Sequence, residues 1–393
     1  MSPSNTTYRA LVFGASGITG WAVVQEALQY PSPATFDKVI GLTNRHLTKS
    51  DALLPEDERL ELHSGVDLRS GASQVEAILR KIDGIEGVTH VYFSAYTGHG
   101  TGFEGIKNSN VDILENAVRA VENICPNLQF WTFQTGGKSY GFEFADKVGV
   151  PETPIKESNP RIPEPYASNI MYYAQYDLLE KLSKGKTWSF AEVRPDGVSG
   201  FVPSNNAMNI AQALGLFLSF FASREGPGAT VPYPGPQAAY TAPHTDISQS
   251  LLARFHIYAS LHPDLTANQA FNIGDEPAGV TWAALWPRIS AYFGLVGSGP
   301  INDNDTPQET FNIDKYMQTH RAEWAAWVVK YNLKEGALEG TDFTFLTMMM
   351  GMAVFRRDYD LSKAQEIGFT ETRDTADGYL TAFELMSKAR IIP

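Results

Sequence analysis

The residues of this sequence that could do chemistry together are a lysine and a pair of tyrosines. Lys138 follows an apolar run at 128–135, and Tyr172 and Tyr173 lie near the start of a helical pattern over 169–184. A phenol can donate a hydrogen bond to an oxygen atom on which negative charge develops, and a nearby ammonium stabilises the phenolate and lowers the pKa of the tyrosine. On the residues alone, helix packing is the simpler explanation of the tyrosine pair, although two adjacent residues of a helix cannot both face the core.

A second chemical signal is the spacing of three glycines near the N-terminus. Gly14, Gly17 and Gly20 lie between the apolar run 10–13 and a helical segment that begins at Trp21. In a strand-turn-helix unit the first glycine can take the turn angles, the second lets a pyrophosphate approach the backbone, and the third lets the helix pack on the strand. The phosphates would then lie on N–H groups at the start of the helix. Glycines also close structural turns, but the position of this triplet at the start of a βαβ pattern favours a dinucleotide site.

The ends of the later strands supply further candidate contacts to a dinucleotide. Arg45 follows the apolar run 38–43 with no acidic residue within 43–47, which favours NADP(H) because a cation accommodates the 2′-phosphate; a surface arginine is the alternative. Asp67 is placed to bind the adenine amino group or, as the alternative, to cap the next helix. The complete set of expected cofactor contacts is Gly14, Ser16, Gly17, Ile18, Gly20, Asn44, Arg45, Asp67, Leu68, Ser94, Ala95, Tyr96, Gln134, Thr135, Pro195 and Val198.

These residues can meet at one edge only if the chain forms a parallel sheet. Apolar runs alternate with helical patterns over the first half of the chain, which is typical of successive βαβ units with right-handed crossovers. The expected strands are 10–13, 38–43, 60–68, 89–93, 128–135 and 188–195. We predict an α/β fold, a Rossmann-type doubly wound parallel sheet with a smaller, mostly helical C-terminal substrate lobe. Residues 1–200 would form the NADP-binding domain, to which segments near 240–260 return, and residues 201–393 would be mainly the substrate-binding lobe.

Composition limits the class of partner and the compartment. The 393 residues carry a formal net charge of −13, which argues against nucleic acid or an anionic membrane as the main partner, because those need clustered Lys and Arg. Cys125 is the only cysteine, so no intramolecular disulfide can form and a reducing, cytoplasmic compartment is expected. No secretory signal and no bilayer-spanning tract are evident. No metal site is expected, because the histidines lack ligand spacing such as HExxH.

Longer motifs show which family the chain resembles. They are GASGITG at 14–20, NR at 44–45, THVYFSAY at 89–96, QTGGK at 134–138, MYY at 171–173, WSFAEVRPDGVSGF at 188–201, AFNIGD at 270–275 and KARIIP at 388–393. Together they resemble the progesterone 5β-reductase/iridoid synthase-like (PRISE) branch of the short-chain dehydrogenases over nearly the whole chain. Ordinary short-chain dehydrogenases have a lysine four residues after the catalytic tyrosine, but here Tyr176 and Asp177 occupy those positions. The resemblance implies that Lys138 replaces the missing lysine and that Tyr172 is the catalytic tyrosine.

The resemblance also implies an activity, the NADPH-dependent reduction of an activated C=C bond. Hydride would reach the β-carbon of an enone or enal, while Tyr172, supported by Lys138, stabilises the enolate oxygen. The expected partner is a hydrophobic small-molecule carbonyl substrate of secondary metabolism. The expected pocket residues are Tyr96, Tyr140, Phe142 and Met349; for the last three, ordinary core packing is the alternative.

Departures from the family pattern leave the substrate open. Met171 stands before the tyrosine pair where the family has phenylalanine, Tyr176-Asp177 replaces Glu-Asp, and the segment after Lys138 is shorter. Residue types do not separate 1,4-reduction from carbonyl reduction or from cofactor-assisted cyclisation of a biosynthetic intermediate. A non-catalytic NADP-sensing protein is a third alternative, which the intact Lys138 and Tyr172 argue against. A homodimer is compatible with all of these functions.

Overall fold

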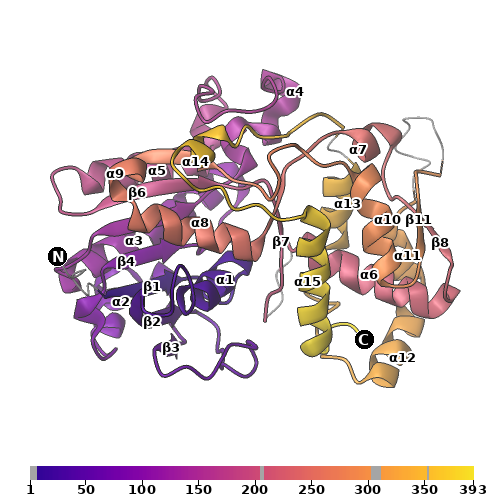
Figure 1. Ribbon diagram of the computed structural model, residues 1–393, viewed down its shortest axis with the longest axis horizontal. Coiled ribbons are helices and arrows are strands. Elements are labelled where there is room, and N and C mark those ends of the chain that lie inside the picture. The colour runs from indigo at the N-terminus through magenta and orange to yellow at the C-terminus, as the bar shows by residue number, and fades with distance from the viewer. Residues whose placement is uncertain (1–6, 204–207, 302–310, 352–353) are drawn as a thin grey trace.

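A seven-stranded parallel sheet forms the core of the left-hand lobe in Figure 1. The computed structural model describes residues 7–203, 208–301, 311–351 and 354–393. The strand order is β3-β2-β1-β4-β5-β6-β10, and every neighbouring pair runs parallel. The strands are β1 (Tyr8–Phe13), β2 (Phe36–Leu42), β3 (Leu60–His63), β4 (His90–Phe93), β5 (Phe130–Gln134), β6 (Ser189–Arg194) and β10 (Gln269–Asn272). The predicted Rossmann-type parallel sheet is confirmed.

Helices cover both faces of this sheet. One face is covered by α2 (Ala72–Leu79), α3 (Gly102–Ile124) and α5 (Met171–Ser183). The other is covered by α1 (Ile18–Ala27) and α8 (Gln249–Leu261), which also contact each other.

The central strands are apolar runs because each side chain is covered whichever face it points to. In β1, Leu11 and Phe13 pack with α2 and α3, whereas Ala10 and Val12 pack with α1. Alternate residues of a strand point to opposite faces, so a sheet covered on both sides buries all of them. This burial explains why the runs at 10–13 and 89–93 could be recognised as strands from the sequence.

The third strand is shorter than predicted. The sequence predicts 60–68, but β3 ends at His63 and Gly65 follows with φ +83°, a left-handed conformation that breaks strand pairing. Gly65 donates its N–H to the Asn44 carbonyl at 3.2 Å, which closes a turn against the end of β2. The segment that contains Asp67 is therefore not part of the sheet.

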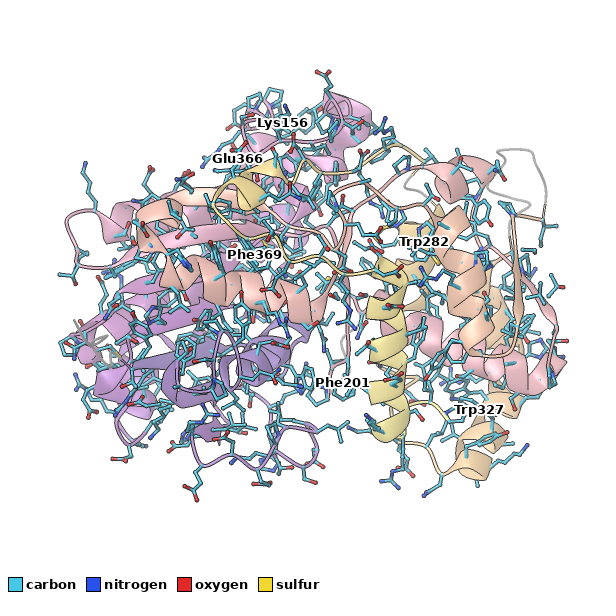
Figure 2. The ribbon with its side chains drawn as sticks, in the orientation of Figure 1. Lys156, Phe201, Trp282, Trp327, Glu366 and Phe369 are labelled. Carbon is cyan, nitrogen blue, oxygen red and sulfur yellow. The ribbon has the colours of Figure 1, made fainter. Side chains whose placement is uncertain are left out.

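The right-hand lobe is mostly helical and is packed around aromatic side chains. The rings of Trp324 and Trp327 lie edge-on to Phe220, with centroids 5.3 and 5.6 Å away, and Trp282, labelled with Trp327 in Figure 2, lies 6.1 Å from Tyr233. Its elements are α6 (Ile210–Glu225), β8 (Thr230–Pro232), α7 (Gln237–Thr241), α10 (Trp282–Tyr292), β11 (Val296–Ser298), α11 (Ile313–Thr319), α12 (Arg321–Tyr331), α13 (Phe343–Gly351) and α15 (Thr375–Lys388). Within the described ranges, no helix combines the length and apolar character needed to cross a bilayer.

Several later segments lie with the sheet. β10 pairs with β6, α8 packs against β5 and β6, and α9 (Pro263–Thr266) and α14 (Ser362–Glu366) pack beside β6 and β10. A short parallel pair, β7 (Gly197–Ser199) with β9 (Asp246–Ser248), lies where the two lobes of Figure 1 meet. Near it, Phe201, labelled in Figure 2, packs edge-on against Trp21 of α1 with centroids 5.3 Å apart.

Candidate active site

The glycine turn after β1 has the geometry that a dinucleotide phosphate site requires. Gly14 has φ +85°, and its carbonyl accepts the N–H of Gly17 at 2.8 Å. A Cβ atom on Gly20 would overlap the Gly14 carbonyl, so only glycine lets α1 approach the turn this closely. Ser16, Gly17 and Ile18 are partly exposed there. Because α1 begins at Ile18 with no side-chain cap, its first N–H groups are available to an anion, and the turn fits a pyrophosphate.

The end of β4 lies directly against this turn. A Cβ on Gly14 would come within 2.9 Å of the Ser94 carbonyl carbon and 3.0 Å of the Ala95 nitrogen. The Ser94 hydroxyl donates to the Phe13 carbonyl at 3.0 Å, which holds the two strand ends together. Ser94 and Ala95, both predicted as cofactor contacts, stay partly exposed there, and Tyr96 follows with 46% of its surface exposed.

The residues expected to contact the adenosine are of two kinds: Asn44 and Arg45 are exposed, whereas Asp67 and Leu68 make contacts within the protein. Asn44 and Arg45 are exposed after β2, and in the described part of the chain Arg45 has no ion pair. Asp67 caps the short 3-10 helix that begins at Leu68, and its carboxylate is 2.8 Å from the Arg69 guanidinium, which holds the pKa of Asp67 below its usual range. Capping is the alternative that the sequence left open for Asp67. Leu68 is buried in the core beside α2 and α3, so its side chain does not face a ligand.

Two buried amide oxygens among these strand ends have no hydrogen-bond partner within the described residues. One is Oε1 of Gln134 at the end of β5. The other is Oε1 of Gln249 at the start of α8, which lies against Gly200; a Cβ there would also come within 2.7 Å of Ile18. Buried acceptors without a donor are rare, so both fit a ligand that donates N–H or O–H groups, as the carboxamide and hydroxyls of a nicotinamide dinucleotide do.

The two adjacent tyrosines of α5 have different environments. The Tyr173 hydroxyl donates to the Ser139 carbonyl at 2.7 Å and accepts the N–H of Ile162 at 3.1 Å, and the side chain is buried. Tyr172 is partly exposed, and its hydroxyl has no hydrogen-bond partner among the residues that the structure describes. A Cβ on Gly136 would lie 3.9 Å from that hydroxyl, which places it at the end of β5. Tyr172 is therefore the tyrosine available to a substrate.

Lys138 lies close to the same strand end but is held by a carboxylate. It belongs to the 3-10 helix η3 (Gly137–Tyr140), and its Nζ is 2.7 Å from Oε1 of Glu143. Burial and then the Glu143 charge raise the pKa of Tyr172. The sequence predicts the opposite, a pKa lowered by the Lys138 ammonium. That prediction is wrong because Glu143 both pairs with the ammonium and acts on the phenol.

The remaining predicted cofactor contacts surround these strand ends. The Thr135 hydroxyl donates to Oε1 of Glu192 at 2.6 Å, and the Pro195 carbonyl would lie 3.2 Å from a Cβ on Gly136. Both residues therefore border the backbone beside Tyr172. Val198, on β7, instead packs against the apolar core under α8.

Two of the predicted pocket residues lie near the candidate site: Tyr96 is close to Tyr172, and Phe142 belongs to the loop after Lys138. The Tyr96 hydroxyl is close enough to Tyr172 to contribute to its raised pKa, after burial and Glu143. Phe142 is partly exposed, and its ring lies against Gly137, where a Cβ would come within 2.7 Å of it.

The other two predicted pocket residues lie in apolar cores. The buried Tyr140 hydroxyl donates to Oδ1 of Asn272 at 2.5 Å, and its ring packs edge-on against Tyr359. Met349, on α13, is partly buried against the core of the helical lobe. For both residues this environment favours core packing, the alternative that the sequence left open.

Known proteins similar to this chain agree with the geometry. The family described as "PRISE-like Rossmann-fold domain" matches residues 10–393. The chain belongs to this family. Relatives include the short chain dehydrogenase sirQ of Leptosphaeria maculans, 35% identical over 98% of this chain and 97% of its own, and the (S)-8-oxocitronellyl enol synthase ISY2 of Nepeta racemosa, 27% identical over 98% and 91%. The fold is similar to that of the GDP-mannoheptose C4 reductase MlghC from Campylobacter jejuni, with a TM-score of 0.58 and 14% identity over 97% of this chain and 98% of that one.

This PRISE-like protein is an oxidoreductase of the short-chain dehydrogenase type, and helix α5 offers no cation one turn after the tyrosine pair. One turn after the pair, Tyr176 donates its hydroxyl to the Asn268 carbonyl at 3.0 Å. Asp177 is 2.6 Å from the Arg161 guanidinium. Both positions are engaged away from the Tyr172 hydroxyl, which leaves Lys138 on the loop after β5 as the candidate for this role.

Two charged residues act on the PRISE tyrosine, and the sequence indicates only one of them. Glu143 lies only five residues after Lys138, in a segment that has no periodic pattern. Glu192 is a buried acid inside β6, where its Oε2 is 2.7 Å from Arg194. A charged pair in an otherwise apolar strand was the available clue, because buried charges occur with a partner.

An aromatic cluster next to Tyr172 was also not anticipated. Phe103, Phe144 and Tyr166 pack in sequence, with centroids 5.0 Å apart for the first pair and 5.2 Å for the second, and Tyr172 packs against the same cluster. Phe103 is exposed. The three rings come from separate segments, so no local spacing indicates them.

A cavity of about 650 Å³ opens on another side of Tyr172, between α5, β6 and β10. Its lining is mainly polar and includes Lys156, labelled in Figure 2, with Arg161, Arg194 and Lys363. These cations are bonded within the protein. Because the lining is mainly polar, the cavity does not match a hydrophobic substrate. No group of three or more His, Cys, Asp or Glu residues in the described ranges is arranged to hold a metal ion.

Proposed function

We propose that this PRISE-like protein is an NADPH-dependent reductase of an activated C=C bond in an enone or enal. The observation that carries the proposal is the contrast between two neighbours: within the described residues the Tyr172 hydroxyl has no partner, whereas that of Tyr173 has two. The raised pKa keeps Tyr172 protonated, so it can donate a hydrogen bond to an oxyanion. A relative named as an enol synthase is consistent with an enolate.

The chemistry that the protein must supply is stabilisation of charge on the carbonyl oxygen. Hydride addition to the β-carbon of an enone moves negative charge onto that oxygen, and Tyr172 donates its hydrogen bond there. The bound dinucleotide would supply the hydride. Phe144 and Tyr166 lie in one apolar cluster with Tyr172, and the exposed ring of Phe103 packs against Phe144, so these rings offer apolar surface that suits a hydrophobic substrate.

The choice of NADPH rests on the residues after β2 and β3. Arg45 is exposed and unpaired in the described chain, while Asp67 is held by Arg69 and so is not free to bind a ribose 2′-hydroxyl. Replacing Arg45→Asp should weaken NADPH binding by roughly 10- to 100-fold, the range for loss of a charged hydrogen bond, and should not weaken NADH binding. Equal affinities of the wild type for NADPH and NADH would contradict the choice.

The proposed reaction is tested with purified protein, NADPH and small enones or enals. Consumption of NADPH and its loss in Tyr172→Phe are expected. With NADPH carrying deuterium at the transferred position, NMR of the product should show label at the β-carbon. Label at a carbinol carbon would identify carbonyl reduction instead, and a rearranged unlabelled product would identify cyclisation. Tight NADP binding without hydride transfer to any carbonyl would favour a sensor.

We place this reaction in the secondary metabolism of the cytoplasm. The relative sirQ is named a short chain dehydrogenase, and the relative ISY2 is named an (S)-8-oxocitronellyl enol synthase. Burial raises the pKa of the Cys125 thiol to about 12, and a single buried, unreactive thiol suits a reducing compartment.

A further inference from the structure

Glu143 is held beside Lys138 by a folded loop, not by chance proximity on the surface. Gly141 has φ +77° and turns the chain between η3 and the 3-10 helix η4 (Phe142–Phe144), which carries Glu143. A Cβ on Gly141 would come within 2.5 Å of Ile162, so this turn is packed tightly against the following segment. The turn brings the Lys138 and Glu143 side chains to 2.7 Å.

Tyr173 is hydrogen-bonded both to η3 and to the segment against which the loop packs. Its hydroxyl donates to the Ser139 carbonyl in η3 and accepts the N–H of Ile162, the residue against which Gly141 packs. The tyrosine next to Tyr172 therefore fixes the loop that positions the ion pair. The pair is a built feature of the site.

The ionisable groups that act on Tyr172 come from three other segments. They are Glu143 from the loop, Tyr96 from the end of β4 and Glu192 from β6. Glu192 is already paired with Arg194 at 2.7 Å. On α5 itself, Asp177 is paired with Arg161. All three groups disfavour a negative charge on the Tyr172 oxygen, and no lowering of the Tyr172 pKa comes from Lys138, whose ammonium is bound to Glu143.

We propose that Glu143 is a positioning residue of the candidate site: by holding the Lys138 ammonium in an ion pair, it keeps Tyr172 a neutral hydrogen-bond donor instead of a phenolate base. This rests on the proposed function only in taking Tyr172 as the residue that meets the substrate. A neutral phenol stabilises an oxyanion formed by hydride addition, whereas removal of a proton from an alcohol requires a phenolate.

The test measures the ionisation of the residue at position 172 without any substrate. Tyr172 is replaced by 3,5-difluorotyrosine, whose phenol ionises at lower pH, and its phenolate absorbance is titrated in the wild-type background and in Glu143→Gln. Loss of Glu143 should lower the apparent pKa by about one unit, a tenfold rise in the ionisation constant. The matched control is Glu152→Gln, an exposed acid of the same loop region with no ion pair in the described chain, and it should leave the titration unchanged.

A second background separates a positioning role from a direct one. In Lys138→Met the Glu143→Gln change should lower the apparent pKa much less than in the wild type, because no ammonium is released. An equal decrease in both backgrounds would overturn the proposal by showing that Glu143 acts on the phenol only through its own charge and not through Lys138. No decrease in either background, or the same decrease in Glu152→Gln, would also overturn it.

Failure of this inference is distinguishable from failure of the proposed function. The titration needs neither NADPH nor an enone, so it can succeed when no enone is reduced. Where reduction is observed, the alkaline limb of kcat against pH, which reports loss of the neutral phenol, should move to lower pH in Glu143→Gln. An unmoved limb with intact turnover would reject the role of Glu143 and leave the reductase assignment standing.

Discussion

Arg357 and Asp196 form a buried ion pair between the strap 354–361 and the chain that follows β6. Nε of Arg357 is 2.6 Å from Oδ2 of Asp196, and the side chains are only 6% and 8% exposed. Asp196 follows β6, and Arg357 lies in the strap 354–361 that returns from α13 to the sheet. A Cβ on Gly137 would lie 2.9 Å from the same carboxylate. The pair therefore links the strap to the loop that carries Lys138.

Removing one partner should expose how much this pair contributes to stability. Arg357→Met leaves Asp196 buried without a counter-ion, and the free energy of unfolding should fall by about 3–5 kcal/mol. The matched control is Arg288→Met, which removes an exposed pair with Asp374 and should cost less than about 1 kcal/mol. Urea unfolding of both variants measures the difference. Similar losses in the two variants would show that the pair of Arg357 and Asp196 contributes no more to stability than an exposed pair.

The tyrosine pair should separate catalysis from stability. Tyr172→Phe removes a hydroxyl that has no partner among the described residues, so the free energy of unfolding should change by less than about 0.5 kcal/mol, while kcat should fall about 100-fold or more. Tyr173→Phe leaves the Ser139 carbonyl and the Ile162 N–H unpaired, which should cost about 1–3 kcal/mol. Steady-state kinetics and urea unfolding measure both effects. The reverse assignment would follow if Tyr173→Phe alone abolished turnover in a fully folded protein.

The glycine turn should tolerate no side chain at its third position. In Gly20→Ala the new methyl overlaps the Gly14 carbonyl, so the turn must open, and dinucleotide affinity should fall about tenfold or more. Gly351→Ala is the control, because a Cβ there would meet no atom of the described residues within 4 Å. Isothermal titration with NADPH measures the affinities. Unchanged binding in Gly20→Ala would place the dinucleotide elsewhere.

Asp275 should make the stability of the protein depend on pH. Burial raises its pKa to about 7, although Ser248 donates its N–H and hydroxyl to the carboxylate at 2.9 and 2.8 Å. This value lies above the ~3.9 of an unfolded Asp. The protonated carboxyl of Asp275 therefore adds to the free energy of unfolding in full below about pH 4, and this contribution is lost as the pH rises through about 7.

Asp275→Asn isolates this contribution, because asparagine keeps the shape and bonding to Ser248 but cannot ionise. As the pH rises from 4 to 8, the free energy of unfolding of the variant should increase relative to that of the wild type, by at most about 1.4 kcal/mol per unit of pKa shift. Urea unfolding at each pH measures the difference, and the low pKa values of buried His90 and His256 cancel in it. A difference independent of pH would mean that Asp275 is ionised throughout.

Much of the sheet was predictable because its signals are local. Apolar runs such as 89–93 lie in strands covered on both faces, and a glycine triplet at fixed spacing is required wherever a helix packs on a tight turn. Boundaries were less predictable: the run 60–68 is apolar enough for a strand, yet Gly65 takes a left-handed conformation and ends the pairing early. The conformation of one residue there outweighs the pattern of its neighbours.

The sequence by itself determined the class of fold, the glycine turn and the presence of a lysine and a tyrosine pair at neighbouring strand and helix ends, because spacing along the chain controls each of these. Only the tertiary structure decided which tyrosine is free, that Glu143 holds Lys138, and that Arg357 reaches Asp196. Those outcomes depend on contacts between segments that fold together from distant or irregular parts of the chain. Hydrogen bonding and charge pairing at such contacts follow from three-dimensional proximity, which periodicity does not encode.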